Sequence, residues 1–414
     1  MLNFSIPLSG LTAASESLSV ISDNLANLNT VGFKGSTASF NDLFYQALGS
    51  NGANNPIQVG QGVTLGSVTT TFTDGGIQPT GVPTNAAITG NGFFVTDNNG
   101  VAEYTRAGNF TLNSEGQLTT QAGQLVMGYP AVNGVVNPSQ TIAPIVVNQG
   151  QLIPASPTTA IQTQTNLDAS SAVGTNFAQP LTVYDSLGTA HVLTYQFTKT
   201  ASNAWDYQIT LPAADTGATG TPTVLASGSL AFNSDGTLAT PTAPVTGIAV
   251  AGLADGASGM NLTWNLQNSG GTALITQSAS PSSTGSTFQD GFGSGTLTNF
   301  HIDSDGTIEG TFSNNQTLAL GQIVIGSFAN PQGLLRVGQN SYQTTLSSGA
   351  VVIGNPGNGG RGTLTGGSVE QSNVDIAAEF ANMIVTQRGY QANARVVTTF
   401  DTLTQNAINM TQGG

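Results

Sequence analysis

The N-terminal end of the chain has a hydrophobic pattern that predicts a helix. From Phe4 to Leu28, apolar or small residues recur at steps that alternate between three and four. This spacing is typical of the narrow seam of a coiled coil rather than of the wider stripe of a surface helix. Ser5 is a candidate N-cap with Pro7 in the first turn, and Gly32 is placed to end the helix.

The C-terminal end has a second seam of the same kind, which runs from Ile376 to Met410. Ser372 followed by Asp375 is a variant of the capping box. At ~1.5 Å per residue, the predicted helix is about 55–60 Å long, which is long for a helix packed inside a globular domain. We expect the two terminal helices to form one coiled-coil-like element.

Between the two ends, the pattern predicts β-strands. Period-two runs occur at Leu181–Tyr184, Val192–Phe197 and Trp205–Leu211, and Gln322–Phe328 is a continuous apolar run expected to be buried on both faces. The predicted fold class is therefore mainly β with α-helical termini.

Three segments of one design predict hairpin turns. Residues 112–118, 232–238 and 302–308 each place an apolar residue at both ends and a glycine before the return strand. Glycine adopts the left-handed backbone conformation that such turns need. The spacing between the three segments is irregular, which argues against a solenoid repeat.

Segments rich in Gly, Pro, Asn, Ser or Thr predict how the chain is divided. Residues 49–62 are expected to form an extended or looped excursion, residues 138–157 and 278–286 to cross between two β domains, and residues 354–362 to separate the last β segment from the terminal helix. The result is a nested organisation with the following parts: paired terminal helices (1–32 and 368–414), an extended connecting region (33–70 and 355–367), a β-rich outer domain (71–145 and 285–354) and an inserted β domain (146–284).

Composition excludes several classes of protein. The 414 residues include 21 acidic and only 7 basic side chains, and no cysteine. Nucleic-acid binding needs clustered cations, and disulfides and thiolate metal sites need cysteine. No apolar run approaches the ~18 residues that span a bilayer. The first basic residue is Lys34, so the N-terminus lacks the positively charged region of a cleaved secretory signal.

The two histidines are weak candidates for catalysis. Period-two spacing places His191 on the strand face opposite Val192, and we interpret it as a solvent-facing side chain rather than a general base. Asp185 and Ser186 are near in sequence, but a Ser-His-Asp triad is defined by geometry that the sequence does not fix. His301, at a hairpin strand, has the same interpretation. Trp205 and Trp264 lie in strand-like runs and are expected in the core.

One acidic loop resembles half of a calcium site. Asp303 and Asp305 alternate before Gly306, and Glu309 follows, but the first ligand and the terminal bidentate glutamate of a complete loop are missing. A turn is the simpler interpretation. Gly90–Phe94 is likewise expected to be a tight turn before a strand, because it lacks the residues of a phosphate-binding loop. No catalytic, cofactor-binding or metal residue is assigned, and no cofactor is expected.

Apolar residues at both chain ends point to self-assembly. Two helices cover only one face of each other, and apolar positions off the seam, such as Val20 and Ile384, would stay exposed on an isolated hairpin. Exposed apolar helix surface is typical of a polymerising subunit. The predicted self-assembly interface comprises Leu11, Leu18, Ile21, Leu25, Leu28, Ile376, Phe380, Met383, Ile384, Tyr390, Val397, Phe400 and Leu403.

Two long motifs carry a family resemblance. Residues Ser17-Leu-Ser-Val-Ile-Ser-Asp-Asn-Leu-Ala-Asn-Leu-Asn-Thr-Val-Gly-Phe-Lys34 resemble the N-terminal signature of the flagellar axial proteins, the rod and hook subunits. The stretch from Gly367 to Ala394, which includes Ser-Val-Glu-Gln-Ser-Asn-Val-Asp375, is similar to their C-terminal signature. The large inserted domain is typical of the hook type, since rod subunits are shorter.

This resemblance implies a structural role and no enzymatic activity. Hook-type members polymerise into a hollow curved tube that transmits torque from rod to filament. The implied partners are further copies of the chain, the rod, hook cap and hook-filament junction proteins, and the flagellar type III export apparatus, without nucleic acid or membrane insertion. The implied location is the extracellular hook. A distal-rod subunit, a β-rich surface adhesin and a polysaccharide-acting enzyme remain as alternatives.

Overall fold

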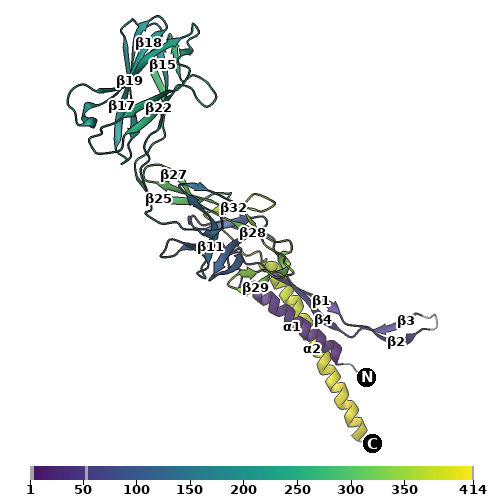
Figure 1. Cartoon of the computed structure of the whole chain (residues 1–414). Coiled ribbons are helices and arrows are strands. Elements are labelled where there is room, and N and C mark those ends of the chain that lie inside the picture. Colours follow the sequence, from purple (N-terminus) through teal and green to yellow (C-terminus); the bar gives the residue numbers. More distant parts are fainter. Residues whose placement is uncertain (1–3, 52–54, 413–414) are drawn as a thin grey trace. The chain divides into compact units, whose positions relative to one another are not determined.

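The computed structural model describes residues 4–51 and 55–412 and divides the chain into two compact units. Unit 1 comprises residues 1–148, 300–310 and 318–414, and unit 2 comprises residues 149–299 and 311–317. Figure 1 shows an α-helix at each chain end and β-strands between them, which confirms the predicted fold class.

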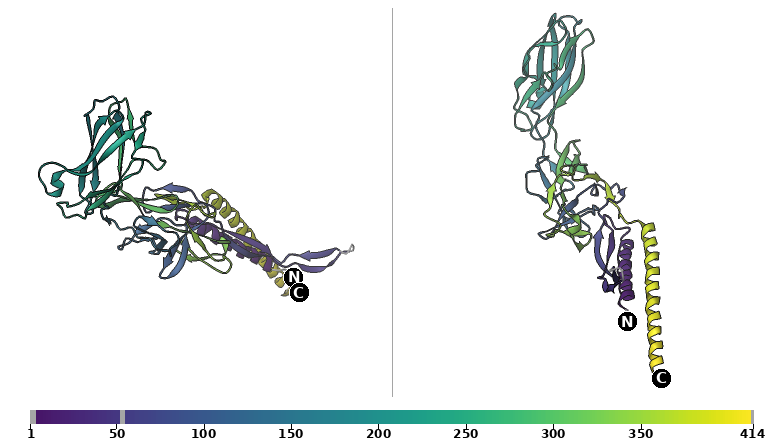
Figure 2. Two further views of the ribbon diagram at one scale, coloured as in Figure 1. Left: turned by 45° about the horizontal axis from the view of Figure 1, so that its top comes forward. Right: turned by 90° about the vertical axis from the view of Figure 1, so that its right-hand side faces the viewer.

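The two terminal helices of unit 1 lie side by side and run antiparallel (Figure 2). Helix α1 spans Ser5–Ala26 and helix α2 spans Ile376–Gln412. The 37 residues of α2 correspond to roughly 55 Å at 1.5 Å per residue, as expected. After Phe400, α2 continues past the first described residue of α1 (Figure 1).

The helix ends differ from the predicted ends. Helix α1 stops at Ala26, and residues 27–32 form turns, so Leu28 lies beyond the helix and Gly32 does not terminate it. No side chain caps α1 at its start, because Ser5 is already inside the helix. Asp375 rather than Ser372 is the N-cap of α2: its Oδ1 accepts hydrogen bonds from the backbone N–H groups of the second and third helical residues, at 2.8 and 3.1 Å.

An extended β-ribbon follows α1. Strands β1 (Ser36–Asp42) and β4 (Val63–Thr70) pair antiparallel, and β2 (Gln46–Ser50) pairs with β3 (Pro56–Val59) further out. The predicted excursion of residues 49–62 is therefore part of a hairpin arm, although residues 52–54 lie outside the described part. In Figure 1, β1 and β4 run beside α1, and β2 and β3 extend away from it.

The β body of unit 1 is built on antiparallel strands. The main path of its large sheet includes β26, β27, β11, β7, β8, β30 and β29 in that order. Phe93, Tyr104 and Tyr342 are nearly fully buried in its core. The strands are β5 (Ile77–Pro79), β6 (Ala86–Thr89), β7 (Phe93–Asn98), β8 (Val101–Thr105), β9 (Thr111–Leu112), β10 (Leu118–Thr119), β11 (Leu125–Val132), β12 (Val135–Val136), β13 (Ala143–Pro144), β26 (Thr307–Phe312), β27 (Thr317–Ile323), β28 (Ile325–Ser327), β29 (Leu335–Gly338), β30 (Ser341–Gln343), β31 (Val352–Gly354), β32 (Thr363–Gly366) and β33 (Ser368–Glu370).

Unit 2 packs two five-stranded sheets around one hydrophobic core. One sheet has the order β16-β17-β18-β19-β20, and in the other β15 lies between β22 and β23 and also pairs with β24. Trp205 and Trp264 are fully buried in this core, as predicted. The ten strands of these sheets are β15 (Ala160–Asp168), β16 (Asn176–Tyr184), β17 (Ala190–Ala201), β18 (Ala204–Leu211), β19 (Thr223–Phe232), β20 (Leu238–Thr240), β21 (Val245–Val250), β22 (Met260–Asn265), β23 (Ile275–Ser278) and β24 (Ser283–Gln289). Outside them, β14 (Leu152–Ile153) pairs with β25 (Gly295–Ile302).

The three predicted hairpin turns are confirmed and share one backbone pattern. Gly116, Gly236 and Gly306 have φ values of 72°, 83° and 86°, in the left-handed region. In each turn the glycine N–H donates to the carbonyl three residues earlier. Gly90–Phe94 is likewise a turn before β7, and residues 321–326 of the continuous apolar run are buried.

Two predicted segment roles are wrong. Residues 278–286 do not return the chain to the outer domain, because β24 pairs with β15 inside unit 2, with Ser286 opposite Gln164. Residues 285–299 therefore belong to unit 2 rather than to the outer domain. Residues 355–367 are more than a connection, because β32 pairs with β6 in the β body of unit 1.

Candidate functional site: the terminal helices and their root

The inner contact of the terminal helices is an antiparallel seam of mixed polarity. The Phe4 and Phe400 rings meet edge to face with centroids 5.8 Å apart. A Cβ added at Gly10 would lie 2.7 Å from Nδ2 of Asn393, so the two helices approach closely at a position where α1 has no side chain. The half-buried positions of α2 are Glu379, Met383, Thr386, Asn393, Ala394, Val397, Phe400 and Thr404.

The structure separates the predicted assembly residues into two groups. Those that pack within the chain are Ile21, which is buried, and the half-buried Leu11, Leu18, Leu25, Leu28, Met383, Val397 and Phe400. Those left exposed are Ile376, Phe380, Ile384, Tyr390 and Leu403. The first group joins α1 to its surroundings, whereas the second group is available for other molecules.

Exposed apolar residues form two stripes on α2 outside the seam. Ile376, Phe380 and Ile384 follow one another at steps of four and are each 52% exposed. Val385, Val396, Leu403 and Met410 are separated by 11, 7 and 7 residues, close to whole helical turns, and therefore share a second face. Helix α1 covers neither stripe, so α2 offers apolar surface in two further directions.

The β-ribbon has exposed apolar side chains that the sequence patterns did not single out. Phe44 is 93% exposed, and Tyr45 and Leu48 are 57% and 62% exposed. They lie on and beside β2, near Ile57 on the partner strand β3. The signal was present in the Leu43–Leu48 segment, but its alternation is too short to distinguish an exposed arm from a core strand.

A buried ionic cluster lies at the root of the helices, which is the region where the segments next to α1 and α2 join the β body of unit 1. Lys34 Nζ is 2.6 Å from Oε1 of Glu370, and both side chains are fully buried. Arg106 Nη1 lies 3.3 Å from the other oxygen of Glu370 and 3.4 Å from Asp74. Burial lowers the pKa of the Lys34 ammonium, and this outweighs the raising effect of Glu370. Two cations face two carboxylates, so the cluster is neutral.

Two asparagines connect this root to both helices. Asn24 of α1 is 2% exposed and donates through Nδ2 to Oε1 of Glu379 on α2, at 2.8 Å. Its amide also pairs with the backbone of Ser36 at the start of β1. Asn373, just before α2, accepts from the backbone N–H of Gly35 and donates to the Thr71 carbonyl, both at 2.8 Å. Sequence analysis missed these residues, because their partners are distant along the chain.

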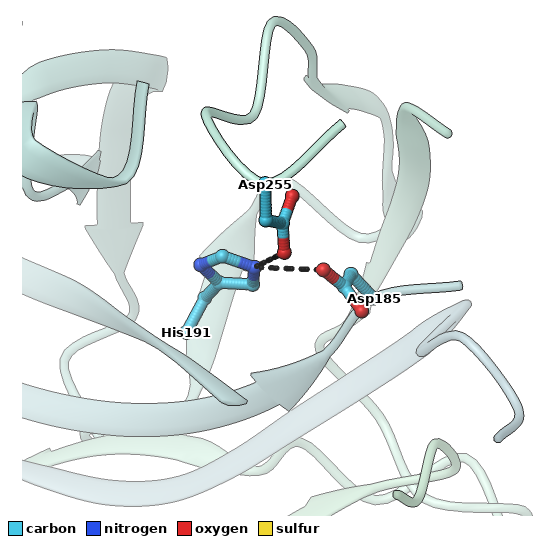
Figure 3. Close-up of side chains that lie close together, drawn as sticks. All are labelled: Asp185, His191 and Asp255. Carbon is cyan, nitrogen blue, oxygen red and sulfur yellow. Dashed lines mark hydrogen bonds and ion pairs between the residues drawn. The ribbon is translucent and has the colours of Figure 1, made fainter. Parts of the chain in front are cut away.

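Unit 2 contains a histidine cluster that contradicts the prediction for His191. The side chain is 5% exposed, because it shares the buried face of β17 with Leu193 and Tyr195, whereas Val192 faces solvent. Figure 3 shows Asp185 and Asp255 both pointing at the same ring nitrogen, Nε2, at 3.1 and 4.0 Å. Nδ1 lies 3.1 Å from Oδ2 of Asp215.

The carboxylates around His191 alter its titration and that of Asp185. Burial alone would lower the pKa of the His191 imidazole, but Asp185 and Asp215 raise it above its usual value. Burial alone would raise the pKa of Asp185, but interactions with Asp255 and His191 and backbone N–H donors bring it down to about 2. The cluster therefore favours a positive charge at the imidazole.

The acidic loop of unit 1 is a turn. Asp305 accepts hydrogen bonds from both the backbone N–H and the hydroxyl of Thr307, so its carboxylate closes the hairpin. His301 faces solvent, as expected, with Nε2 3.3 Å from Asp303 and 3.9 Å from Glu309. Within residues 4–51 and 55–412, no helix has the length and hydropathy needed to cross a membrane.

Comparison with protein families places the chain among the flagellar axial proteins. Residues 6–34 match the flagella basal body rod protein model, and residues 365–410 match the C-terminal model of the flagellar basal body rod FlgEFG proteins. Residues 87–165 match the flagellar hook protein FlgE/F/G D1 domain, and residues 147–292 match the flagellar basal body protein FlaE D2 domain. The two terminal matches contain most of α1 and most of α2.

Full-length relatives narrow this class. The chain is 36% identical over 424 residues to the flagellar hook protein FlgE of Salmonella typhimurium, covering 99% of this chain and all of the relative. It is 37% identical over 421 residues to FlgE of Escherichia coli, covering 98% of this chain and 99% of the relative. The chain belongs to the flagellar hook protein family.

A solved structure supports the fold. The crystal structure of Helicobacter pylori flagellar hook protein FlgE2 aligns with 69% of this chain and 98% of its own, with a TM-score of 0.55 and 15% identity. At this identity the likeness concerns the architecture alone. Because 69% of this chain is aligned, the likeness supports the mainly β architecture.

Proposed function

We propose that this chain is the building block of the flagellar hook and that many copies polymerise into a hollow, curved, flexible tube. In that tube the terminal helices form the inner layers, and the β body of unit 1 and unit 2 face outward. The tube transmits torque from the rod to the filament. Family membership supports this role, and the apolar stripes on α2 supply the surface that assembly requires.

The observation that carries the proposal is the uncovered apolar surface of α2. Ile376, Phe380 and Ile384 are half exposed, and burying the exposed half of such a side chain contributes about 0.8–1.5 kcal/mol. The second stripe, which includes Val396 and Leu403, lies on another face of the helix. A helix with apolar surface in two directions beyond its partner is suited to an interior layer where several copies meet.

The β-ribbon supplies a further contact surface. Phe44, Tyr45 and Leu48 project from an arm whose strands have no other sheet neighbours among the described residues. Such an arm reaches beyond its own helix pair. We infer that it packs against a neighbouring copy and extends the contacts made by the helices.

The proposed location and partners follow from this role. The subunit acts in the extracellular hook, exported through the flagellar type III apparatus without a cleaved signal. Its partners are further copies of itself, and rod, hook cap and hook-filament junction proteins at the ends of the tube. The family is structural, and we propose no enzymatic activity and no cofactor.

The test is polymerisation of the purified full-length chain. We expect curved tubes by electron microscopy, and we expect the double substitution Phe380→Asp with Ile384→Asp to abolish them while circular dichroism shows intact β units. The matched control is Leu187→Asp with Val224→Asp, which places two charges at exposed apolar positions of unit 2. Tubes formed equally well by the α2 variant would refute the assignment, and straight tubes would favour a distal-rod subunit.

A further inference from the structure

The histidine cluster of unit 2 brings together side chains from four separate places in the chain. Asp185 lies in the turn between β16 and β17, and His191 lies on β17. Asp215 lies in the short 3-10 helix Ala213–Thr216, and Asp255 in the loop between β21 and β22. Nothing in the proposed assembly role uses this cluster.

The charge balance of the cluster is unfavourable without a cation. Unit 2 has one lysine and no arginine, and Lys199 lies eight residues from His191 along β17, roughly 26 Å away at ~3.3 Å per residue. Three of the aspartates of unit 2 nevertheless converge on one imidazole. With all three carboxylates ionised, even a protonated imidazole would leave an excess of two negative charges around a side chain that is 5% exposed, although the side chains of Asp215 and Asp255 are themselves 25% and 28% exposed.

In both Asp185 and Asp255, the carboxylate oxygen that does not face His191 already accepts hydrogen bonds from the backbone. Oδ1 of Asp185 accepts the backbone N–H groups of Leu187 and Thr189, both at 2.8 Å. Oδ1 of Asp255 accepts the N–H of Ala257 at 3.0 Å. These bonds hold both carboxylates in place and leave both Oδ2 atoms directed at Nε2 of His191 (Figure 3).

The other ring nitrogen of the buried imidazole, Nδ1, faces a third carboxylate. Nδ1 of His191 lies 3.1 Å from Oδ2 of Asp215, but the two groups are not aligned for a hydrogen bond. The His191 side chain is only 5% exposed. A nearby carboxylate on the ring nitrogen opposite the ligand is the usual second partner of a metal-bound histidine. The ring is therefore oriented to present Nε2 to the two facing carboxylates.

The spacing of the three ligand atoms fits a small divalent cation. Nε2 of His191 and the carboxylate oxygens of Asp185 and Asp255 all lie within 4.8 Å of one another. Ligands at ~2.0–2.1 Å from a tetrahedral zinc are roughly 3.3–3.4 Å apart, and the distances of 3.1 and 4.0 Å from Nε2 bracket this value. We propose that Asp185, His191 and Asp255 bind a first-row divalent cation such as Zn²⁺.

The donor set selects the class of metal. Imidazole suits zinc, iron, nickel and copper, whereas sites for calcium and magnesium use oxygen ligands alone. Because a metal-bound imidazole is neutral, a divalent cation replaces the proton on Nε2 and reduces the excess from two negative charges to one. It also joins the β16–β17 turn to the β21–β22 loop. Those two connections already touch, because the backbone N–H of Ser258 donates to the hydroxyl of Ser186 at 3.0 Å. Metal binding would therefore stiffen one end of unit 2.

The test is titration of the metal-free full-length chain with Zn²⁺ near neutral pH, by calorimetry. We expect one high-affinity equivalent per chain and a higher melting temperature with zinc. Substituting Co²⁺ should give visible d–d absorption that reports nitrogen and oxygen ligation. His191→Gln should weaken binding at least tenfold, and Asp255→Asn, in a partly exposed loop, should do so without disturbing the core.

The control is His301→Gln, which changes the exposed histidine beside Asp303 and Glu309. It should leave the affinity unchanged. Loss of binding in this variant alone would overturn the proposal and assign the metal to that surface cluster. Absence of binding up to about 1 mM zinc would also overturn it, and would identify the cluster as an ionic network around a protonated imidazole. Tube formation is scored separately, so either result leaves the assembly proposal to its own test.

Discussion

Lys34 and Glu370 form an ion pair with a separation of 2.6 Å although they are 336 residues apart in the sequence. Lys34 follows the turns after α1, and Glu370 ends the strand before α2. Because both side chains are fully buried, the pair fixes where the two terminal segments leave the β body.

We predict that Lys34→Met strongly destabilises unit 1. The substitution leaves the Glu370 carboxylate buried without its nearest cation, and breaking a buried pair in this way costs about 3–5 kcal/mol. Chemical denaturation of the monomer measures the change in the free energy of unfolding. Arg388→Met, at an exposed position of α2, should change it by less than about 0.5 kcal/mol. Equal effects of the two substitutions would contradict the prediction.

Two glycines of the helix pair should respond in opposite ways to alanine. Nothing lies within 4 Å of a Cβ added at Gly389, so Gly389→Ala should stabilise the monomer by about 0.5–1 kcal/mol through helix propensity. Gly10→Ala should lose this gain, because its Cβ would meet Asn393 at 2.7 Å. Thermal melts followed by circular dichroism compare the two variants. A stabilised Gly10→Ala variant would show that the helices pack less closely than described.

The ribbon should matter for assembly and not for the monomer. Phe44→Ser with Leu48→Ser removes two largely exposed apolar side chains, so we expect the free energy of unfolding to change by less than about 0.5 kcal/mol. The critical concentration for polymerisation should rise, because the inferred contact with a neighbouring copy loses apolar area. Sedimentation of assembled material measures it, and an unchanged critical concentration would remove the ribbon from the interface.

Asp290 should contribute a pH-dependent part of the stability of unit 2. Its partial burial raises the pKa, but hydrogen bonds from Ala160 and Thr159 outweigh this, so the pKa lies below the usual value. A depressed carboxyl pKa stabilises the fold above the unfolded value of about 3.9, and this contribution is lost as the pH falls through the folded pKa. Asp290→Asn should therefore be less stable than the parent at neutral pH, with the difference shrinking below about pH 4. A pH-independent difference in urea unfolding would count against this explanation.

The sequence predicts which segments form helices and strands better than it predicts which face of each element is buried. At β17 the alternation predicts a strand, but a phase based on Val192 places His191 on the solvent face, whereas the structure buries it. The run of Leu193, Tyr195 and Phe197 gives the correct phase, because three large residues define a buried face more firmly than one valine. No local pattern could have placed Asp215 and Asp255 beside this histidine, since loops from elsewhere in the chain bring them there.

The seam of α2 shows a similar limit. Hydrophobic spacing predicts that apolar residues face the partner helix, yet the half-buried positions include Glu379, Thr386 and Asn393, while Phe380 is exposed. Glu379 is held inside by a hydrogen bond to Asn24, a contact that hydrophobic spacing does not encode. Helix formation follows from local sequence, whereas the choice of inner face depends on partners that are distant in the chain or belong to other molecules.

The pairing of β5 with β33 has a mechanical consequence. Glu370 ends β33 opposite Ile77, its carbonyl accepts the N–H of Gly32, and its carboxylate holds Lys34. Tension applied to either terminus therefore enters the β body through the same few residues, in the shear direction of paired strands. A pull on one helix is shared with the other at this joint before it can reach the rest of the molecule.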